Sequence, residues 1–261
     1  MTYLTLGSCL KNEEPYMMDF IKYHRYVGVE KFVFFDREFH PLSKLLANEP
    51  DVEIIHFPDV PENVHAEGWA KLILHNRWKT KWLALIDADQ VLVPVKTNDV
   101  KEILKNYEEF ASLQCNWHTF GSSGHINKGE GSLYERFLMR AASNAGINAH
   151  TQFICQPDRT LPIRTKDPHH PQLPDHEVSV NTNKGRVVGP FSNPPLHDTL
   201  WIAHYISKSK EEWAIKNAKG RADIFGQKMP FDLFDHHDTF CNAEKEERVL
   251  QLWNEANKVI V

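Results

Sequence analysis

The sequence predicts an α/β fold in which helices cover both faces of a central sheet. Short apolar runs alternate with segments whose apolar residues recur every three or four positions through the first half of the chain. This strand–helix repetition is typical of doubly wound sheets, and runs with almost no polar residue indicate strands covered on both faces. Three of the runs end in polar clusters, at the strand ends where such sheets bind ligands.

The first elements surround one of these polar turns. Residues 2–10 form an apolar run, so we expect a strand there, and Pro15 suits the first turn of the helix that follows. Apolar residues then recur at helical spacing until Gly28, which supplies the stop. A second strand is expected at residues 31–35, and it ends at Asp36.

The next elements repeat this order. We expect a short helix at residues 41–47, a third strand at residues 52–57 and a longer helix at residues 67–78, where apolar residues recur at i, i+3 and i+4. Residues 82–86 are the expected fourth strand, and a fifth strand precedes Trp117.

Beyond about residue 120 the chain becomes rich in Gly, Pro, His and Asn, which mark turns and loops. Helices are expected at residues 208–220 and 242–261, and the second of them has an apolar face that includes Trp253. Neither an internal repeat nor a flexible linker divides the sequence. We therefore expect one domain over residues 1–261, with a loop-rich second half.

Composition and charge exclude several classes of protein. Of the 261 residues 41% are hydrophobic, and 30 Lys and Arg stand against 35 Asp and Glu, so neither a disordered chain nor a basic nucleic-acid-binding protein is expected. The longest apolar runs, at residues 82–86 and 91–95, fall far short of the roughly 20 residues that span a bilayer. The first ten residues lack a secretory leader, and the four cysteines form no CxxC pair. These features predict a soluble, cytoplasmic protein with buried thiols and no membrane span.

Asp87 and Asp89 directly follow the expected strand at residues 82–86. Two carboxylates at i and i+2, leaving a buried strand, can converge on one divalent ion. Mg²⁺ and Mn²⁺ prefer oxygen ligands and keep open positions for phosphate oxygens. A solvated Asp-X-Asp turn is the alternative, but the position at the ligand-binding edge of the sheet favours a metal site.

Four blocks of sequence resemble GT-A-fold glycosyltransferases, and more narrowly the family-2-like and family 92 group. Together the matching segments span about residues 3–220 and stand in the family's order. Gln90 departs from the pattern, because the family carries Glu there, which puts a carboxylate beside the metal site in doubt. The blocks are CLKNE at residues 9–13, WLALIDADQ at residues 82–90, NWHTFGSSGH at residues 116–125 and IAHYISKSKEEW at residues 202–213.

The resemblance implies a GT-A fold, a Rossmann-like mixed sheet flanked by helices. Residues 1–118 would form the nucleotide-binding half, and residues 119–261 the acceptor-side half with the C-terminal helices. It also implies a hexosyltransferase-type enzyme of glycan or polysaccharide synthesis, which moves a sugar with inversion from a nucleoside-diphosphate sugar to an acceptor hydroxyl. UDP- or GDP-sugars are the expected donors, and Mn²⁺ or Mg²⁺ is the expected cofactor.

The resemblance further assigns residues to the site. A histidine late in the chain often completes the metal site of these enzymes, and His204 follows an apolar strand as the two aspartates do. The expected metal ligands are Asp87, Asp89 and His204. The expected nucleotide-sugar contacts are Lys11, Asn12, Glu13, Asp36, Asn76, Arg77, Asp87 and Lys208. The expected sugar or acceptor contacts are Trp117, Gly121, Gly124 and His125, in a loop after the fifth strand.

Several of these assignments have a structural alternative. Asn12 and Glu13 would also suit a helix cap, because both residue types favour helix starts. Arg77 would suit an exposed helix end, Lys208 a solvated helix start, and Trp117 the core beside a tight turn.

An inverting transferase needs a carboxylate that takes the acceptor proton. Glu135 follows the glycine loop, where this fold commonly sets its base, and Asp198 and Asp238 are the rival candidates. The alternative for Glu135 is an ordinary helix residue paired with Arg136 or Arg140.

Two other classes of function stay open. A haloacid-dehalogenase-like phosphatase also places Asp-X-Asp after an apolar strand, but normally after the first strand and with Thr or Val next, where this chain has Gln90. A non-catalytic nucleotide- or carbohydrate-binding protein on a transferase scaffold is the other. The histidine pairs at residues 169–170 and 236–237 suit exposed loops, so we do not expect them to be primary metal ligands.

Overall fold

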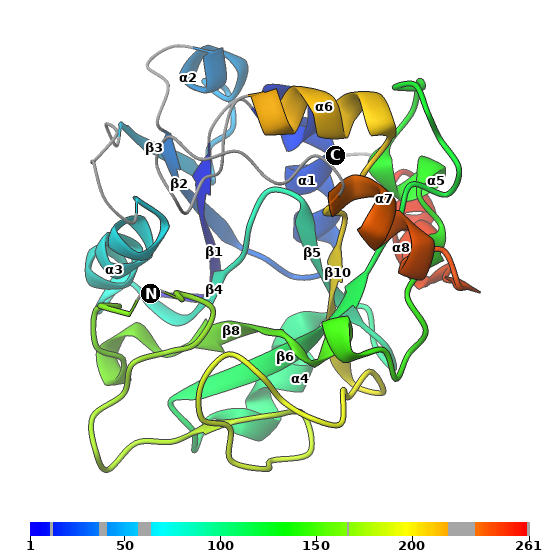
Figure 1. Ribbon diagram of the computed structural model, residues 1–261. Coiled ribbons are helices and arrows are strands. Elements are labelled where there is room, and N and C mark those ends of the chain that lie inside the picture. Colours follow the sequence, from blue (N-terminus) through cyan, green and yellow to red (C-terminus); the bar gives the residue numbers. More distant parts are fainter. Residues whose placement is uncertain (11–12, 37–40, 57–63, 166, 219–232, 260–261) are drawn as a thin grey trace.

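A mixed sheet of nine strands forms the centre of the molecule (Figure 1). The structure is a computed structural model. The residues it describes are 1–10, 13–36, 41–56, 64–165, 167–218 and 233–259.

Four parallel strands form the first half of the sheet. They lie in the order β3 (Val52–His56), β2 (Lys31–Asp36), β1 (Thr2–Leu10) and β4 (Thr80–Leu85). Most residues of β1, β2 and β4 are buried, which is the reason why their sequences are almost continuously apolar.

The second half of the sheet is mixed. β8 (Thr151–Cys155) runs antiparallel between β4 and β6 (Ser112–Thr119). β10 (Leu200–His204) is parallel to β6, and β5 (Gln90–Pro94) ends the row antiparallel to β10. The short strand β9 (Ser179–Val180) also pairs with β6. A separate two-stranded sheet pairs β7 (Met139–Arg140) with β11 (Glu244–Lys245).

This topology places several strand ends together. Because β4 and β6 both run antiparallel to β8, they point the same way, and β10 points with β6. The carboxyl ends of β1, β2, β4, β6 and β10 therefore lie at one edge of the sheet, where α/β proteins bind their ligands.

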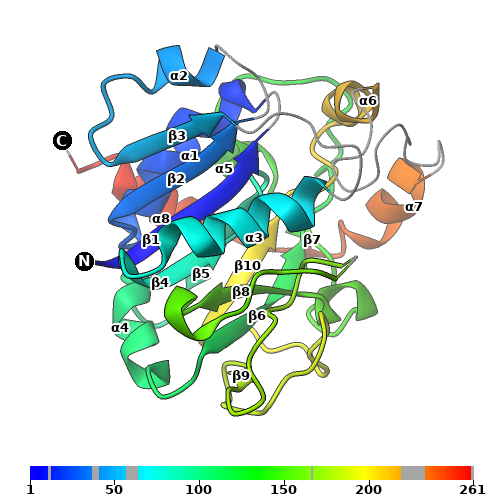
Figure 2. The same ribbon diagram turned by 90° about the vertical axis from the view of Figure 1, so that its left-hand side faces the viewer.

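Helices cover both faces of the sheet (Figure 2). On one face, Trp69 of α3 shares a buried cluster with Leu83 of β4. On the other face, Phe20 of α1 and Trp253 of α8 belong to a larger buried cluster. The α-helices are α1 (Glu14–Tyr26), α2 (Pro41–Leu45), α3 (Val64–Asn76), α4 (Val100–Leu104), α5 (Leu133–Arg136), α6 (Lys210–Ala218), α7 (Leu233–Phe240) and α8 (Arg248–Ala256). Short 3₁₀ turns are η1 (Lys105–Tyr107), η2 (Gly146–Ala149) and η3 (Pro157–Arg159).

The predicted α/β fold, with a mixed sheet flanked by helices and a loop-rich second half, is confirmed. Three details of the prediction are wrong. Trp117 lies inside β6 rather than in the loop after it. The C-terminal helix begins at Arg248 rather than at residue 242, because β11 pairs with β7 first. The histidines at residues 236–237 lie on α7 and not in a loop.

No helix in the described ranges combines the length and the apolar character that crossing a membrane requires. Cys115, Cys155 and Cys241 are buried, and burial raises the pKa of all three thiols, which keeps them protonated.

Candidate active site

The register between β5 and β10 brings Asp89 next to His204. Gln90 lies opposite His204 in this antiparallel pair, and the Tyr205 N–H donates to the Asp89 carbonyl at 2.8 Å. As a result, the His204 Nε2 lies 3.7 Å from the Asp89 Oδ1. Two side chains that are 115 residues apart in the sequence (204 − 89) thus meet at the carboxyl edge of the sheet.

Two lysines add positive charge beside Asp89. The Lys216 Nζ, from α6, donates to the Asp89 Oδ2 at 2.6 Å, and Lys208, just before α6, is buried nearby. Burial favours the neutral acid, but Lys216, His204 and Lys208 outweigh it and hold the pKa of Asp89 well below its usual range. The carboxylate is therefore ionised although it is buried.

His204 is neutral at physiological pH. Burial lowers the pKa of His204 to about 4, although the Asp89 carboxylate opposes the shift. A neutral imidazole is the form that binds a metal ion. The Trp117 ring packs against the His204 ring with centroids 4.4 Å apart, which fixes the orientation of the imidazole.

Asp87 faces a different set of partners. The His65 Nε2 lies 2.9 Å from the Asp87 Oδ1, and the Gln90 amide donates to the Asp87 Oδ2 at 3.1 Å. The Gln90 Oε1 in turn accepts from the Gln152 amide at 2.8 Å. Burial raises the pKa of Asp87, but His65 and His169 outweigh it and lower the pKa overall. Gln90, at the position where the resemblance implies Glu, can donate to Asp87, which an ionised Glu could not do.

The structure divides the predicted metal trio between these two sets. Two groups of three His and Asp residues in the described ranges have ligand atoms that all lie within 4.8 Å of one another. Neither group contains Asp89 or His204, and one of them joins Asp87 to His65 and His169. Asp89 and His204 form a neighbouring pair, and Asp87 and Asp89 influence each other's charge. The assignment of all three to one ion stays a prediction.

Lys208 connects Asp89 to the start of α1. Its Nζ lies 3.9 Å from the Glu13 Oε2 and 3.9 Å from the centre of the Tyr16 ring. The Glu13 side chain does not cap α1, although the residue stands at the N-cap position. Asp36 is buried at the end of β2, on the same sheet edge. The other two predicted residues of this turn, Lys11 and Asn12, lie outside the described residues.

Asn76 and Arg77 lie elsewhere. They end α3, which returns the chain to the start of β4, whereas the Asp87 turn follows the end of β4. Asn76 donates to the Leu72 carbonyl at 2.8 Å, and Arg77 donates to the carbonyls of η3 and the residue after it, at 2.8 Å for Thr160. These contacts finish α3 and hold a turn on the opposite edge of the sheet.

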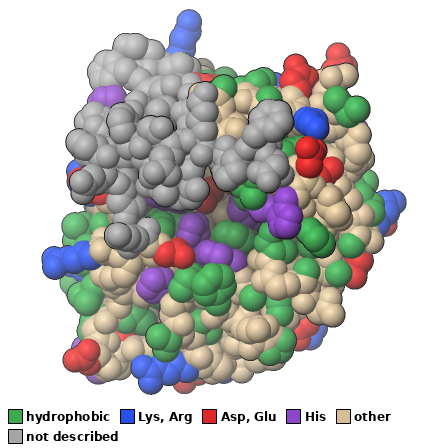
Figure 3. All heavy atoms as spheres, viewed as in Figure 1, with side chains coloured by type: hydrophobic (Ala, Val, Ile, Leu, Met, Phe, Trp, Pro, Cys, Tyr) green, Lys and Arg blue, Asp and Glu red, His purple; other side chains and the backbone are tan. Residues whose placement is uncertain are grey.

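Histidine side chains gather near the middle of one face of the molecule (Figure 3). Several of them surround Trp117. Its ring stacks on His150 with centroids 4.1 Å apart and meets His169 edge-on at 5.6 Å. Burial lowers the pKa of His150 to about 4, so this imidazole is neutral too. Trp117 therefore forms a shared aromatic wall between His204 and the group around Asp87.

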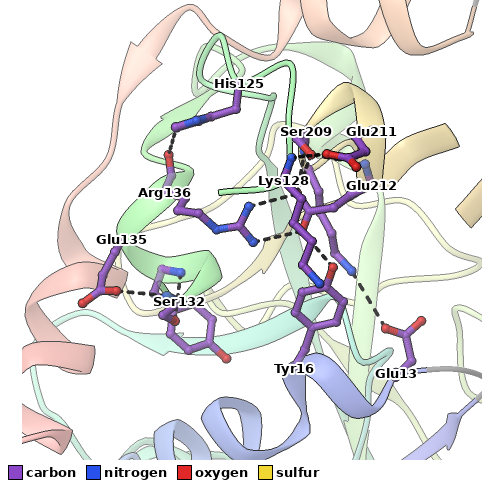
Figure 4. A network of polar contacts seen from close by, with 12 residues as sticks. Glu13, Tyr16, His125, Lys128, Ser132, Glu135, Arg136, Ser209, Glu211 and Glu212 are labelled. Atoms are coloured by element: carbon purple, nitrogen blue, oxygen red, sulfur yellow. Dashed lines mark hydrogen bonds and ion pairs between the residues drawn. The ribbon is translucent and has the colours of Figure 1, made fainter. Parts of the chain in front are cut away.

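The glycine loop after β6 is held by α7 and the turn behind it. The Asp238 carboxylate accepts from the Ser122 N–H at 2.6 Å and from the Ser122 hydroxyl at 2.8 Å. A Cβ on Gly121 would meet the Cys241 carbonyl at 2.6 Å, so close packing explains this glycine. Gly124 has a φ of +81°, which a turn requires of it. His125 contacts the Arg136 carbonyl at 3.0 Å through its Nε2 (Figure 4).

One candidate base is held by local structure, and another lies away from the pair formed by Asp89 and His204. Glu135 is exposed and accepts from the Ser132 N–H at 2.9 Å in a capping box at the start of α5 (Figure 4). Asp198 is exposed and precedes β10, whereas His204 ends that strand. Asp198 therefore lies toward the edge of the sheet opposite to the site.

Sequence reasoning missed Lys216, His65 and the position of His169. Lys216 follows Glu212 by one helical turn, a spacing at which Glu and Lys often pair on a helix surface, so the sequence alone does not distinguish it from a surface lysine. His65 stands at the start of α3, and His169 was interpreted as part of an exposed loop. Each becomes visible only when the sheet edge brings three distant segments together.

Comparisons with known proteins agree with the resemblance in the motifs. The family model of glycosyltransferase family 92 matches residues 7–190. A glycosyltransferase family 92 protein of Oryza sativa subsp. japonica is 22% identical over 185 residues, which is 69% of this chain and 31% of the rice protein. The chain thus spans about a third of the length of this relative.

Among solved structures, S. aureus TarS in complex with UDP-GlcNAc has a TM-score of 0.39 and 12% identity, and covers 64% of this chain and 51% of its own. The TarS complex with UDP has a TM-score of 0.37 and 10% identity, and the match covers 60% of this chain and 47% of the TarS chain. Because the family model matches more than half of the residues, the chain belongs to glycosyltransferase family 92.

Proposed function

We propose that this chain is a metal-dependent glycosyltransferase that moves a sugar from a UDP- or GDP-sugar to an acceptor hydroxyl. Family membership supports the class of reaction. The observation that carries the proposal is the pair formed by Asp89 and His204, an ionised carboxylate and a neutral imidazole 3.7 Å apart at the carboxyl edge of the sheet. We further propose that residues 1–261 act as one transferase domain, with the donor bound by the first half and the acceptor by the second.

Asp89 and His204 suit a divalent ion. Both are in the protonation state that metal binding requires, and Mn²⁺ or Mg²⁺ accepts an oxygen and a nitrogen ligand while it keeps positions for phosphate oxygens. When bound, such an ion offsets the negative charge that builds on the β-phosphate as the sugar leaves.

The two lysines supply the fixed charge of the site. Lys208 and Lys216 flank Asp89, and a diphosphate beside this carboxylate would be within reach of both ammonium groups. Burial lowers the pKa of Lys208, and the nearby Glu13 and Asp89 carboxylates oppose the shift. Preorganised charge of this kind is usually the largest catalytic contribution at a developing anion. The donor nucleotide would extend from here toward Glu13, at the start of α1, and Asp36, at the end of β2.

The acceptor side is proposed to lie along Trp117. An indole face suits the apolar side of a sugar ring, and one face of this ring is already covered by His150. Inversion needs a base, and the contacts of Glu135 and Asp238 with backbone groups do not support either of them in that role. The anomeric configuration of the product, measured by proton NMR, tests inversion separately.

A panel of thermal unfolding measurements tests the proposal. The chain is mixed with UDP, GDP or inorganic phosphate, each with and without Mn²⁺, and the release of sugar from UDP- and GDP-sugars is followed in parallel. We expect one nucleoside diphosphate to raise the Tm only when Mn²⁺ is present, because a ligand that binds the native state stabilises it.

Each outcome of the panel separates two classes of function. Stabilisation by a nucleoside diphosphate with metal, followed by sugar release, supports the transferase. A higher Tm with inorganic phosphate, but with neither nucleoside diphosphate, would favour the phosphatase. Nucleotide binding without sugar release or transfer would favour a binding protein. Full sugar release in EDTA would contradict the metal dependence.

A further inference from the structure

His65, Asp87 and His169 form a cluster that the reaction proposed above does not use. The three side chains come from the start of α3, the turn after β4 and the loop after η3. Their ligand atoms all lie within 4.8 Å of one another, and the His65 Nε2 lies 2.9 Å from the Asp87 Oδ1. The side chains are 9%, 25% and 19% exposed, so the cluster is largely shielded from solvent.

We infer that this cluster is a second metal site, for a transition-metal ion of the Zn²⁺ type, distinct from the site at Asp89 and His204. Two imidazoles and one carboxylate are the protein ligands of many Zn²⁺ sites that keep a fourth position open. Mg²⁺ and Ca²⁺ prefer oxygen ligands, so this donor set discriminates against them.

The orientation of His169 supports a ligand role. Its Nδ1 lies 2.7 Å from the Asp167 Oδ1, and the same oxygen accepts from the His169 N–H at 3.0 Å. A carboxylate that accepts from Nδ1 places the proton there and leaves the lone pair on Nε2. Metal-binding histidines typically hold their other nitrogen on a carboxylate in this way, because it fixes the tautomer and the ring.

The same contact decides between the two candidate groups. Asp167 could itself join His150 and His169, but its side chain is 43% exposed, and its oxygen is already bonded to His169 at 2.7 Å. We therefore assign Asp167 as a positioning residue, and His169 as a ligand shared with Asp87.

Two tryptophans enclose the cluster. The Trp69 ring meets His65 at 4.3 Å and His169 at 5.7 Å, both nearly perpendicular. The Trp117 ring meets His169 at 5.6 Å and also contacts His204. An apolar wall of this kind limits water and strengthens the attraction between an ion and its ligands. Trp117 contacts His204, and Asp87 and Asp89 belong to one turn. The second site therefore lies directly beside the proposed donor site at Asp89 and His204.

The test is equilibrium binding of Zn²⁺ to the full chain, stripped of metal, in excess Mg²⁺. We expect wild-type protein to bind one Zn²⁺, and His65→Ala and His169→Ala to lose this binding. Asp167→Ala should weaken binding by about 10–100-fold, as expected for a residue that orients a ligand. His236→Ala, which removes an exposed histidine of α7, is the matched control and should bind as the wild type does.

Asp89→Asn separates this site from the donor site. Zn²⁺ binding that persists in Asp89→Asn, while Mn²⁺-dependent nucleotide binding is lost, supports two sites and leaves each proposal to succeed or fail alone. Co²⁺ in the wild-type protein gives a reading that needs no variant, because four-coordinate Co²⁺ absorbs strongly in the visible range. The inference would be overturned if His65→Ala and His169→Ala each bound Zn²⁺ with the wild-type affinity. It would also be overturned if Asp89→Asn lost the Zn²⁺ ion.

Discussion

Two buried carboxylates, Glu212 of α6 and Asp89, which contacts the same helix, are used in opposite ways. Glu212 lies on α6 and accepts from both terminal nitrogens of Arg136 at 2.9 Å, from the Tyr16 hydroxyl at 2.8 Å and from the Ser209 hydroxyl at 2.6 Å (Figure 4). Asp89 receives Lys216 from the next turn of α6 at 2.6 Å, which is its only side-chain hydrogen-bond donor in the described part of the chain.

The difference lies in how far the acceptor capacity of each carboxylate is filled. A carboxylate offers about four lone-pair positions, and the partners of Glu212 take all of them. Among the described residues, no side chain donates a hydrogen bond to the other Asp89 oxygen, Oδ1, which lies 3.7 Å from the Nε2 of the neutral His204. A filled buried carboxylate joins elements, whereas a partly filled one can still bind an ion. We therefore expect changes at Glu212 to cost stability and changes at Asp89 to cost function.

The largest effect is expected for Glu212→Ala. The variant leaves Arg136 buried without its counterion, because the side chains of this pair are only 6% and 3% exposed. Breaking a buried pair in this way costs about 3–5 kcal/mol, measured as the free energy of unfolding in urea. Glu211→Ala is the matched control, because Glu211 is exposed and its side chain accepts only one hydrogen bond among the described residues, from the Lys128 N–H at 2.6 Å, so its loss should cost about 1 kcal/mol. Equal losses in the two variants would contradict the comparison.

Asp89→Asn should reduce activity strongly and stability only slightly. The amide keeps the shape of the side chain but removes the charge that we propose holds the metal, so metal-dependent sugar release should fall by about 10²–10³-fold, the size seen when one electrostatic stabiliser is lost. The urea midpoint should move much less than in Glu212→Ala. Wild-type kcat in Asp89→Asn at saturating Mn²⁺ would remove Asp89 from the proposed site.

The fold was more predictable than the site, for a physical reason. Strands that are covered on both faces consist almost entirely of apolar residues. The bounds of β1, β2 and β4 were therefore predicted to within one or two residues. The position of Asp87 and Asp89 at a strand end followed from the same pattern. These features depend on residues that are close together in the sequence.

The partners of the aspartates depend on distant segments instead. Lys216 reaches Asp89 only because β10 carries the chain back to the same edge before α6 begins. His65 and His169 meet Asp87 because α3 and the loop after η3 approach the same turn from different directions. Arg77 shows the converse error. It is close to Asp87 in the sequence, but it lies before the start of β4, at the edge of the sheet opposite to the site. Side-chain pairing across a sheet edge has no periodicity that a sequence could reveal.

Acid should distinguish Glu212 from an ordinary surface glutamate. Burial raises the pKa of Glu212, but Arg136, Ser209 and Tyr16 outweigh it and lower the pKa to about 2, from an ordinary value near 4.5. Between these values the unfolded chain binds more protons than the native one, so stability falls as the pH falls. The Glu212 carboxylate makes its full contribution to the free energy of unfolding above about pH 4.5, and this contribution is lost as the pH falls through 2.

The measurement for this prediction is the free energy of unfolding of the wild type and of Glu212→Gln between pH 7 and pH 3. The difference between the two proteins should be constant at the upper end and shrink below about pH 4.5, because protonated Glu212 resembles Gln. A difference that grows on acidification would show that Glu212 is stabilised as the neutral acid.

The smallest effect concerns the cation that Asp89 already holds. The Lys216 ammonium occupies the Asp89 Oδ2 at 2.6 Å, so a divalent ion at Asp89 would have to share the carboxylate with it or displace it. Lys216→Met removes this competitor and should tighten Mn²⁺ binding in the absence of nucleotide on the order of tenfold, or ~1.4 kcal/mol. Nucleotide affinity should weaken in the same variant, because a positive charge beside the diphosphate is lost.

Lys210→Met, which removes an exposed lysine of the same helix that pairs with Asp235, is the control and should alter neither affinity. Weaker Mn²⁺ binding in Lys216→Met would mean that the lysine positions Asp89 for the ion, and the contrast with the filled carboxylate of Glu212 would then rest on His204 alone.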